Sequence, residues 1–320
     1  MTRSGGYRLS IVLPAFMTGL VFAILSLGSA RVLALEHEQP GADLTKEGAD
    51  TCLGCHNDPS MQVIFRTPHG QQTDPASPMA QLQCEACHGP GGDHADRRQP
   101  RPGHAPVVNF GATAGSSIEA QNAVCMDCHQ DDVSLAWTGS AHERNDTSCA
   151  SCHSVHTAVD PVSLQAEQAN VCFDCHQQQQ ADSLKPSAHP IRFNQMVCGD
   201  CHSPHASVSS GQLTRNTTNE LCLSCHQEYR GPVLFDHAPV SEDCSLCHQP
   251  HGSIHPALLT RRPPLLCQSC HSQAGHPSAS FTSNSLPDGN PSVMVLERSC
   301  MNCHTQVHGS NHPSGYKLMR

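Results

Sequence analysis

The residues best able to do chemistry in this 320-residue chain are its 20 cysteines and 24 histidines. Every cysteine belongs to one of ten copies of the pattern Cys-x-x-Cys-His, so the three residues act as a set. The cysteine pairs are Cys52 and Cys55, Cys84 and Cys87, Cys125 and Cys128, Cys149 and Cys152, Cys172 and Cys175, Cys198 and Cys201, Cys222 and Cys225, Cys244 and Cys247, Cys267 and Cys270, and Cys300 and Cys303. The histidines that follow them are His56, His88, His129, His153, His176, His202, His226, His248, His271 and His304.

This pattern is the attachment signal for c-type haem. Its two thiols add to the two vinyl groups of one porphyrin, and the histidine that follows is the proximal ligand of the iron. Disulfides, structural zinc sites and thioredoxin-type redox sites also use cysteine in exported or Cys-x-x-Cys-containing chains. None of them needs histidine directly after the second cysteine. The sequence therefore predicts ten covalently bound haem c groups, one on each motif.

The second axial ligand decides what each iron can do, because an open face can bind a substrate whereas two protein ligands favour electron transfer. Apart from the proximal residues, 14 histidines remain. Odd-numbered motifs have one extra histidine before the next motif, and even-numbered motifs have one a few residues downstream, which makes a repeat of two motifs. We predict that these ten residues are the distal ligands: His69, His94, His142, His156, His189, His205, His237, His251, His276 and His308.

A histidine three residues after a proximal ligand, such as His156 or His205, is too near in sequence to reach the far face of its own haem. We therefore expect it to cap a neighbouring haem. Four further histidines are expected to be surface or structural residues. The four are His37, His104, His255 and His312. Three of them remain alternative distal ligands. His255 and His312 lie four residues after the distal candidates His251 and His308, and His104 competes with His94.

The composition indicates how these motifs are positioned. Aromatic residues make up 4% of the chain, while 24 prolines and 23 glycines favour turns and short elements. Such a chain lacks the side chains for a normal core, and ten porphyrins would supply the missing apolar material. We predict a multihaem cytochrome c fold, mostly irregular with short helices wrapped around a linear array of ten haems. The net charge of −10 argues against nucleic acid as a partner.

The N-terminus has the pattern of a secretory signal peptide. Arg3 and Arg8 precede an apolar run, and small residues ending at Ala34 offer a cleavage site, with Ala30 as an alternative. An uncleaved membrane anchor is the competing interpretation, because the run is close to the roughly 20 residues a membrane helix needs. We expect residues 1–34 to be removed and residues 35–320 to form one elongated unit in the periplasm. Two five-haem halves would meet near residues 188–194.

Several segments resemble the DmsE/MtrA family of periplasmic decahaem cytochromes. They are the ten motifs themselves, Cys84-Glu-Ala-Cys-His-Gly-Pro-Gly-Gly-Asp-His94, Arg230-Gly-Pro ahead of His237, His251-Gly-Ser-Ile-His255-Pro, and Val307-His308-Gly-Ser-Asn-His312-Pro-Ser-Gly. The resemblance implies histidine on both faces of every iron and an electron conduit at the outer membrane. It implies three partners: an outer-membrane β-barrel porin, an extracellular multihaem cytochrome or reductase, and a periplasmic or inner-membrane cytochrome donor. A long N-terminal extension typical of iron-oxidising relatives is missing, which favours the export-type members.

Two other functions are compatible with the motifs. A multihaem reductase would need an open coordination position, and such enzymes commonly carry a lysine in place of one proximal histidine. All ten motifs here end in histidine, which favours an electron-transfer protein that is not an enzyme. A freely diffusing periplasmic shuttle would use the same haem array, and the sequence alone does not separate it from the conduit.

Overall fold

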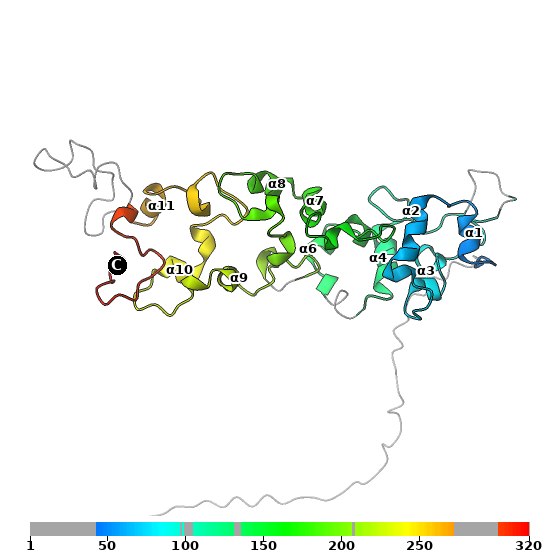
Figure 1. The fold of residues 1–320 in the computed structure, drawn as a ribbon, viewed down its shortest axis with the longest axis horizontal. Coiled ribbons are helices and arrows are strands. Elements are labelled where there is room, and N and C mark those ends of the chain that lie inside the picture. The colour runs from blue at the N-terminus through cyan, green and yellow to red at the C-terminus, as the bar shows by residue number, and fades with distance from the viewer. Residues whose placement is uncertain are drawn as a thin grey trace, which may run out of the picture. The chain divides into compact units, whose positions relative to one another are not determined.

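The computed structural model describes residues 43–96, 98, 105–130, 136–206, 209–271 and 300–319. The predicted signal peptide (1–34) and the histidines His37, His104 and His276 lie outside the described residues. Residues Ala42–Arg320 form one compact unit. Within that unit the elements follow one another in chain order, from the blue α1 to the red segment at the C-terminus (Figure 1).

The described residues form short helices joined by turns, and they contain isolated β-bridges but no strand. The α-helices are α1 (Ala49–Leu53), α2 (Pro59–Gln62), α3 (Glu85–His88), α4 (Ile118–Met126), α6 (Ala141–Arg144), α7 (Gln168–Phe173), α8 (Gln177–Ser183), α9 (Thr218–Cys225), α10 (Ala238–Glu242) and α11 (Leu265–Gln268). The 3₁₀ turns are η1 (Val63–Arg66), η2 (Pro68–Gly70), η3 (Pro78–Ala80), η4 (Cys149–Ser151), η5 (Pro161–Ser163), η6 (Pro190–Phe193), η7 (Cys198–Asp200), η8 (Ser210–Gln212), η9 (Gln227–Tyr229), η10 (Cys244–Leu246), η11 (Pro256–Leu258) and η12 (Cys300–Asn302). The predicted fold class, a mostly irregular multihaem cytochrome with short helices, is confirmed.

Local sequence explains where the longer helices begin and end. Helix α4 starts after Ser117, whose Oγ accepts a hydrogen bond from the Ala120 amide at 3.2 Å. Helix α9 starts in the same way after Thr217, which accepts from the Glu220 amide at 3.1 Å. A hydroxyl at this position satisfies one of the free N–H groups of the first turn. At the other end His226, with φ −89° and ψ 58°, leaves the helical conformation, so α9 ends where its attachment motif ends.

Odd and even motifs are built differently. The first cysteine of each odd-numbered motif lies in an α-helix, namely α1, α4, α7, α9 or α11. The first cysteine of most even-numbered motifs instead begins a 3₁₀ turn, namely η4, η7, η10 or η12. The second motif differs, because its cysteine Cys84 precedes the short helix α3. The repeat of two motifs seen in the sequence is therefore a repeat of backbone structure as well.

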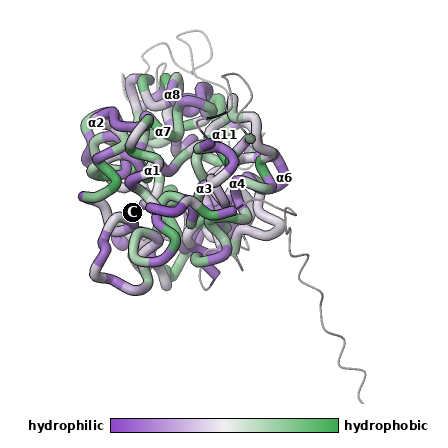
Figure 2. Tube along the Cα trace, turned by 90° about the vertical axis from the view of Figure 1, so that its right-hand side faces the viewer, coloured by the Kyte–Doolittle hydropathy of each residue, from purple (hydrophilic) through white to green (hydrophobic). Residues whose placement is uncertain are grey.

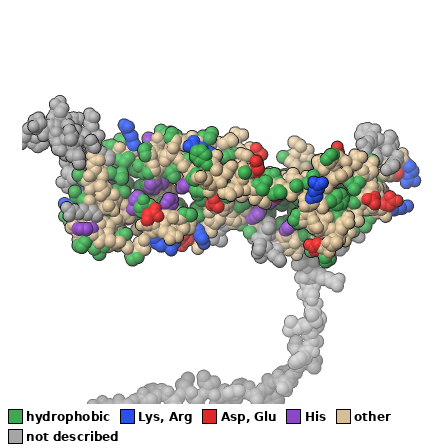
Figure 3. Space-filling model, in the orientation of Figure 1, with side chains coloured by type: hydrophobic (Ala, Val, Ile, Leu, Met, Phe, Trp, Pro, Cys, Tyr) green, Lys and Arg blue, Asp and Glu red, His purple; other side chains and the backbone are tan. Residues whose placement is uncertain are grey.

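Few apolar side chains are buried by the chain itself. Among the described residues the buried hydrophobic ones are Ala49, Met79, Trp137 and Ala169, while Leu184 is 62% exposed. Hydrophilic and hydrophobic segments are intermingled along the tube (Figure 2). Histidine side chains lie in hollows of the face drawn in Figure 3. Burial of so few apolar side chains cannot offset the conformational entropy that the chain loses on folding. This fold therefore needs apolar material beyond its own side chains.

In the part of the chain that the structure describes, no helix has the length and apolar character needed to cross a membrane.

Candidate haem-binding site

All ten attachment motifs share one backbone turn. In each, the amide of the histidine donates a hydrogen bond to the carbonyl of the first cysteine, four residues earlier, at 2.9–3.0 Å. The turn is the same whether the motif ends an α-helix or begins a 3₁₀ turn. It places the two thiols and the imidazole of each motif close together, as attachment to one porphyrin edge and ligation beneath it require.

Consecutive motifs lie near one another in strict sequence order. At every one of the nine junctions between consecutive motifs, a thiol of one motif lies near enough to a thiol of the next to shift its pKa. The interacting thiols alternate along the chain. At one junction they belong to the first cysteines of the two motifs, and at the next junction they belong to the second cysteines. The pairs are Cys52–Cys84, Cys87–Cys128, Cys125–Cys149, Cys152–Cys175, Cys172–Cys198, Cys201–Cys225, Cys222–Cys244, Cys247–Cys270 and Cys267–Cys300. The attachment sites therefore form a continuous series without a break.

Packing shifts the pKa of these thiols in both directions, since a hydrogen bond with Cys125 lowers the pKa of Cys149 to about 7 and one with Cys172 lowers that of Cys198 to about 7, whereas other thiols are raised. Burial, followed by the nearby Cys84 thiol, raises the pKa of Cys52 to about 11. Burial and Cys222 raise the pKa of Cys244 to about 11 in the same way. Because the thiolate is the nucleophile, a packed thiol of this kind reacts slowly at neutral pH. We therefore expect thioether formation at Cys52 and Cys244 to precede packing of their motifs.

Nine proximal histidines each face one of the distal candidates. The separations between ring centroids fall within 5.9–6.4 Å in all nine pairs. With the proximal residue first, the pairs are His56–His94, His88–His156, His129–His69, His153–His205, His176–His142, His202–His251, His226–His189, His248–His308 and His271–His237.

This spacing fits an iron held between two imidazoles. Two metal–nitrogen bonds of about 2 Å each, together with the two ring radii, give a centroid separation of about 6 Å. Direct stacking would bring the rings closer, and unrelated histidines would show no common distance. The donor set of each pair, two imidazoles on opposite sides of a gap, matches what a six-coordinate haem requires.

The pairing follows a rule that skips one motif. The histidine after an odd motif faces the proximal ligand two motifs ahead, as His142 faces His176. The histidine after an even motif faces the proximal ligand two motifs back, as His205 faces His153. At the N-terminal end the rule is interrupted, because His94 faces His56 of the adjacent motif. Neighbouring repeats are thus interlocked in both directions.

Backbone carbonyls fix the tautomer of many of these rings. A carbonyl can only accept, so each bonded Nδ1 carries the proton, and Nε2 is the unprotonated nitrogen that can ligate a metal. Distances from Nδ1 to the carbonyl oxygen are 2.6–3.0 Å. The pairs are His88 with Val108, His94 with Ala105, His142 with Pro204, His189 with Pro250, His202 with Gly211, His237 with Val307, His248 with Ala257 and His304 with Lys317.

Burial also keeps several distal imidazoles neutral. It is the main cause that lowers the pKa of His69, and the nearby His129 ring adds to the effect. For His205 the cause is again burial, reinforced by His153 and His142. The pKa of His251 is lowered by burial and then by His202. A neutral imidazole is the form that binds a metal ion, so these shifts favour ligation.

The spare histidines are placed differently from the paired ones. His251 and His308 face proximal rings at 5.9 and 6.1 Å. In contrast, Nδ1 of His312 accepts a hydrogen bond from the Ser314 amide at 3.2 Å. The amide of His255 donates to Ser253 Oγ at 2.9 Å within the same loop. The geometry therefore favours His251 and His308 over their competitors four residues downstream.

Two side chains beside these rings were not singled out from the sequence. Trp137, the single tryptophan of the chain, lies 6.5 Å from the His142 ring at 16° and 6.4 Å from the His205 ring. Asp160 accepts a hydrogen bond from His153 Nδ1 at 2.6 Å. The sequence offered one indication for the Asp160 contact, because Asp160 lies only seven residues after the predicted proximal ligand His153. Nothing local in the sequence marks Trp137 as a neighbour of His205, which is far along the chain.

The motifs line one continuous cavity of about 4980 Å³. Its lining includes residues from the first motif to the last, among them Cys52 and His304. An ordinary small-molecule pocket has about 300–1,000 Å³. A cavity several times larger, edged by paired imidazoles and thiols, fits a row of large flat cofactors rather than one substrate.

Comparison with known proteins finds similar sequences. The family described as "Doubled CXXCH motif" matches residues 189–231 and 237–276, and "Cytochrome c-type protein NrfB-like" matches residues 84–167. Over 151 residues the chain is 28% identical to the cytochrome c-type protein NrfB of Escherichia coli, covering 44% of this chain and 72% of that protein. A solved undecahaem cytochrome from the S-layer of Carboxydothermus ferrireducens shares 22% identity at a TM-score of 0.11 over 75% of this chain, which spans about a third (32%) of that structure.

The multihaem cytochrome MtrA of Shewanella baltica is 48% identical over 277 residues, which cover 86% of this chain and 82% of that protein. With covalent haem c indicated by the doubled motifs, the chain belongs to the MtrA-type family of multihaem c-type cytochromes and is an electron-transfer protein.

Proposed function

We propose that this chain is an electron conduit of the outer membrane, with ten haem c groups in a continuous row. The observation that carries the proposal is the single cavity of about 4980 Å³ that the attachment motifs line from the first to the last, with thiols of consecutive motifs close enough to interact electrostatically at all nine junctions. Haem iron supplies reversible one-electron chemistry when bound. The chain's part is to hold ten such groups in sequence, so that no large gap interrupts the row.

The proposed roles of the site residues follow from the geometry. The 20 cysteines form thioethers, and the ten histidines that close the motifs are proximal ligands. The nine distal histidines that face them are the second ligands. His276 lies outside the described residues, and it is the distal candidate that remains for His304. On this assignment every iron has histidine on both sides, so the chain is not an enzyme, because catalysis at the metal needs an open position.

The conduit proposal places the chain in the periplasm, inside a porin. The hydrocarbon core of a membrane is about 30 Å thick and excludes unpaired backbone groups, so a loop-rich chain can enter it only within a closed barrel. The lumen of a wide barrel is polar, which suits the mixture of polar and apolar side chains on the face drawn in Figure 3. The proposed partners are a β-barrel porin, an extracellular multihaem cytochrome or reductase, and a periplasmic or inner-membrane cytochrome donor. Similarity to MtrA supports this set.

A liposome experiment tests the conduit. The haem-loaded cytochrome and its candidate porin are placed in vesicles that enclose a redox dye, and a membrane-impermeant reductant is added outside. We expect fast dye reduction with both proteins and slow reduction with either alone. Equal rates with and without the cytochrome would exclude a conduit and leave a diffusing periplasmic shuttle. Vesicles with the porin and a two-haem fragment of the chain control for leakage through the barrel.

A further inference from the structure

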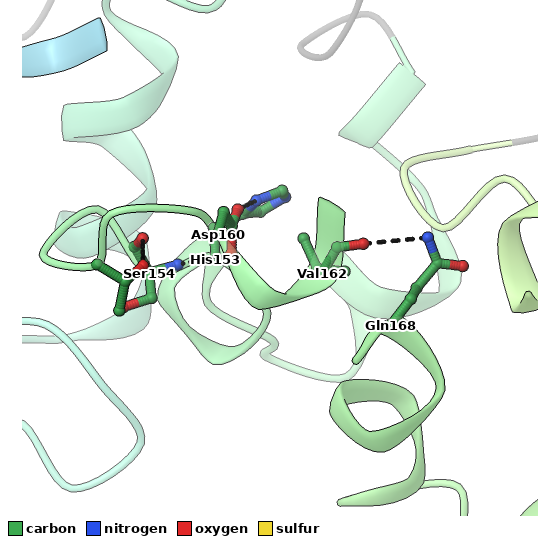
Figure 4. A network of polar contacts seen from close by, with 6 residues as sticks. His153, Ser154, Asp160, Val162 and Gln168 are labelled. Carbon is green, nitrogen blue, oxygen red and sulfur yellow. Dashed lines mark hydrogen bonds and ion pairs between the residues drawn. The ribbon is translucent and has the colours of Figure 1, made fainter. Parts of the chain in front are cut away.

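The proximal histidine of the fourth motif has an unusual hydrogen-bond acceptor. His88, His202 and His248 donate Nδ1 to backbone carbonyls. His153 instead donates to the carboxylate of Asp160, with Nδ1 and Oδ2 2.6 Å apart. Figure 4 shows the carboxylate beside the imidazole in the loop between η4 and η5. A carboxylate is a stronger acceptor than a carbonyl and brings a full negative charge next to the ring.

The loop holds Asp160 firmly in this position. Its other oxygen, Oδ1, accepts a hydrogen bond from the Ser154 amide at 3.2 Å. Asp160 is also the residue that precedes Pro161 at the start of η5. Its side chain is 24% exposed, so solvent screens the contact only in part. Both carboxylate oxygens are therefore engaged, and the contact with His153 is a built feature of the loop.

The seventh motif offers a weaker version of the same contact. Glu228 Oε1 lies 3.6 Å from His226 Nδ1, which is beyond hydrogen-bond distance. The Glu228 side chain is 60% exposed, so water competes for it. Asp160 is thus bonded to a proximal imidazole, whereas Glu228 is near one but not bonded.

We propose that Asp160 is a positioning residue that lowers the reduction potential of the haem on Cys149 and Cys152 below those of the haems on the sixth and eighth motifs. The inference rests on the proposed ligation of that haem by His153 and His205, whose rings are 5.9 Å apart and nearly parallel at 15°. A carboxylate that accepts from Nδ1–H makes the imidazole a more basic ligand, and a more basic ligand favours the oxidised iron. The negative charge of Asp160 acts in the same direction.

The consequence is an uneven potential profile along the row. In the sixth and eighth motifs the proximal imidazoles donate to the carbonyls of Gly211 and Ala257 instead. The haems on these two motifs therefore have higher reduction potentials. The fourth haem then has a lower potential than the sixth and the eighth. Electrons occupy it only briefly during transfer, and a partly reduced protein keeps it oxidised longest.

Redox titration of the purified, haem-loaded protein tests the proposal. Asp160→Asn keeps an oxygen that can accept from Nδ1 but removes the charge. We expect one of the ten equal absorbance steps to move to higher potential while the other nine stay in place. Asp160→Glu should return that step towards its original potential. An unchanged titration in Asp160→Asn would overturn the proposal, even if the protein melts at a lower temperature.

Two controls separate this inference from the ligation on which it rests. Glu228→Gln should leave all ten steps unmoved, because that carboxylate is exposed and not bonded to His226. Electron paramagnetic resonance of each oxidised sample reports the ligation itself. A fully low-spin spectrum with no shift in Asp160→Asn would refute the role of Asp160 alone. A substantial high-spin signal in the unmodified protein would refute the bis-histidine assignment instead.

Discussion

The repeat formed by motifs three and four can be compared with the one formed by motifs five and six. In both, a helix ends in the odd motif and a 3₁₀ turn begins the even one, with α4 and η4 in the first and α7 and η7 in the second. In both, a polar side chain of the helix bonds the even motif. Asn122 accepts from the Cys149 amide at 2.8 Å, and Gln168 accepts from the Gly199 amide at 2.7 Å.

The two repeats differ in what surrounds the rings. Trp137 packs against His142 and His205 in the first and is 7% exposed, whereas the residue at the same distance before His189 is Leu184, which is 62% exposed. The proximal imidazole is bonded by Asp160 in the first and by the Gly211 carbonyl in the second. The backbone repeat therefore holds each cofactor in a common way, while a few side chains give individual haems their own properties.

The largest effect is expected from removing one attachment site. Cys172→Ala with Cys175→Ala should abolish attachment of the fifth haem and unfold the centre of the chain, because porphyrin provides much of the buried apolar surface. His142, which belongs to the preceding repeat and faces His176, should lose the haem that it is proposed to ligate. Mass spectrometry should show nine haems, and limited proteolysis should cut near residues 136–145.

The matched change in the other repeat sharpens this result. Cys125→Ala with Cys128→Ala should free His69, which faces His129, and leave the segment around His142 protected. Cleavage at the same places in both variants would contradict the pairing by alternate motifs.

Replacing a distal ligand should have the next largest effect. His205→Met and His251→Met should each raise the potential of one haem strongly, since axial-ligand identity sets haem potentials over a range of about 0.8 V. Because Asp160 still bonds His153, the haem altered by His205→Met should remain below the one altered by His251→Met. Redox titration measures both, and the reverse order would count against the comparison of the two repeats.

Trp137 should contribute more to stability than its counterpart. Trp137→Ala removes a buried aromatic side chain, which typically costs about 3–5 kcal/mol. Leu184→Ala, at an exposed site, should change stability by about 0.5 kcal/mol or less. Denaturant titration of the holoprotein, followed by haem absorbance, measures the two values. Similar losses in both variants would show that the ring contacts of Trp137 are unimportant.

The smallest effect is expected at the helix side chains that bridge motifs. Asn122 accepts from the Cys149 amide and also donates to the Thr147 carbonyl at 3.1 Å. Asn122→Ala should destabilise the protein by about 1–2 kcal/mol, the usual result of leaving part-buried backbone groups without a partner. Asn219→Ala should destabilise the protein by a similar amount, because Asn219 accepts a hydrogen bond from the Cys244 amide in the same manner. Thermal melts would test both, and a difference of several degrees between them would contradict equivalence of the repeats.

Much of this protein was predictable from local sequence. Cys-x-x-Cys-His fixes thiols and proximal ligand within one turn, so no long-range information is needed to identify these residues. The low aromatic content and the frequent proline and glycine predicted short helices, and that fold class is confirmed. The distal set came from the register of spare histidines and stays a prediction; nine of its members face proximal rings, and His276 lies outside the described residues.

The sequence by itself determined which residues attach cofactors, because that chemistry depends on neighbours within five positions. Only the tertiary structure decided which distal histidine faces which proximal one, since His142 meets His176 and His205 meets His153 across long segments of chain. It also decided that Asp160 touches His153 and that Trp137 reaches His205. Such contacts depend on how successive turns pack around bodies the size of a porphyrin, and spacing along the chain does not encode that packing.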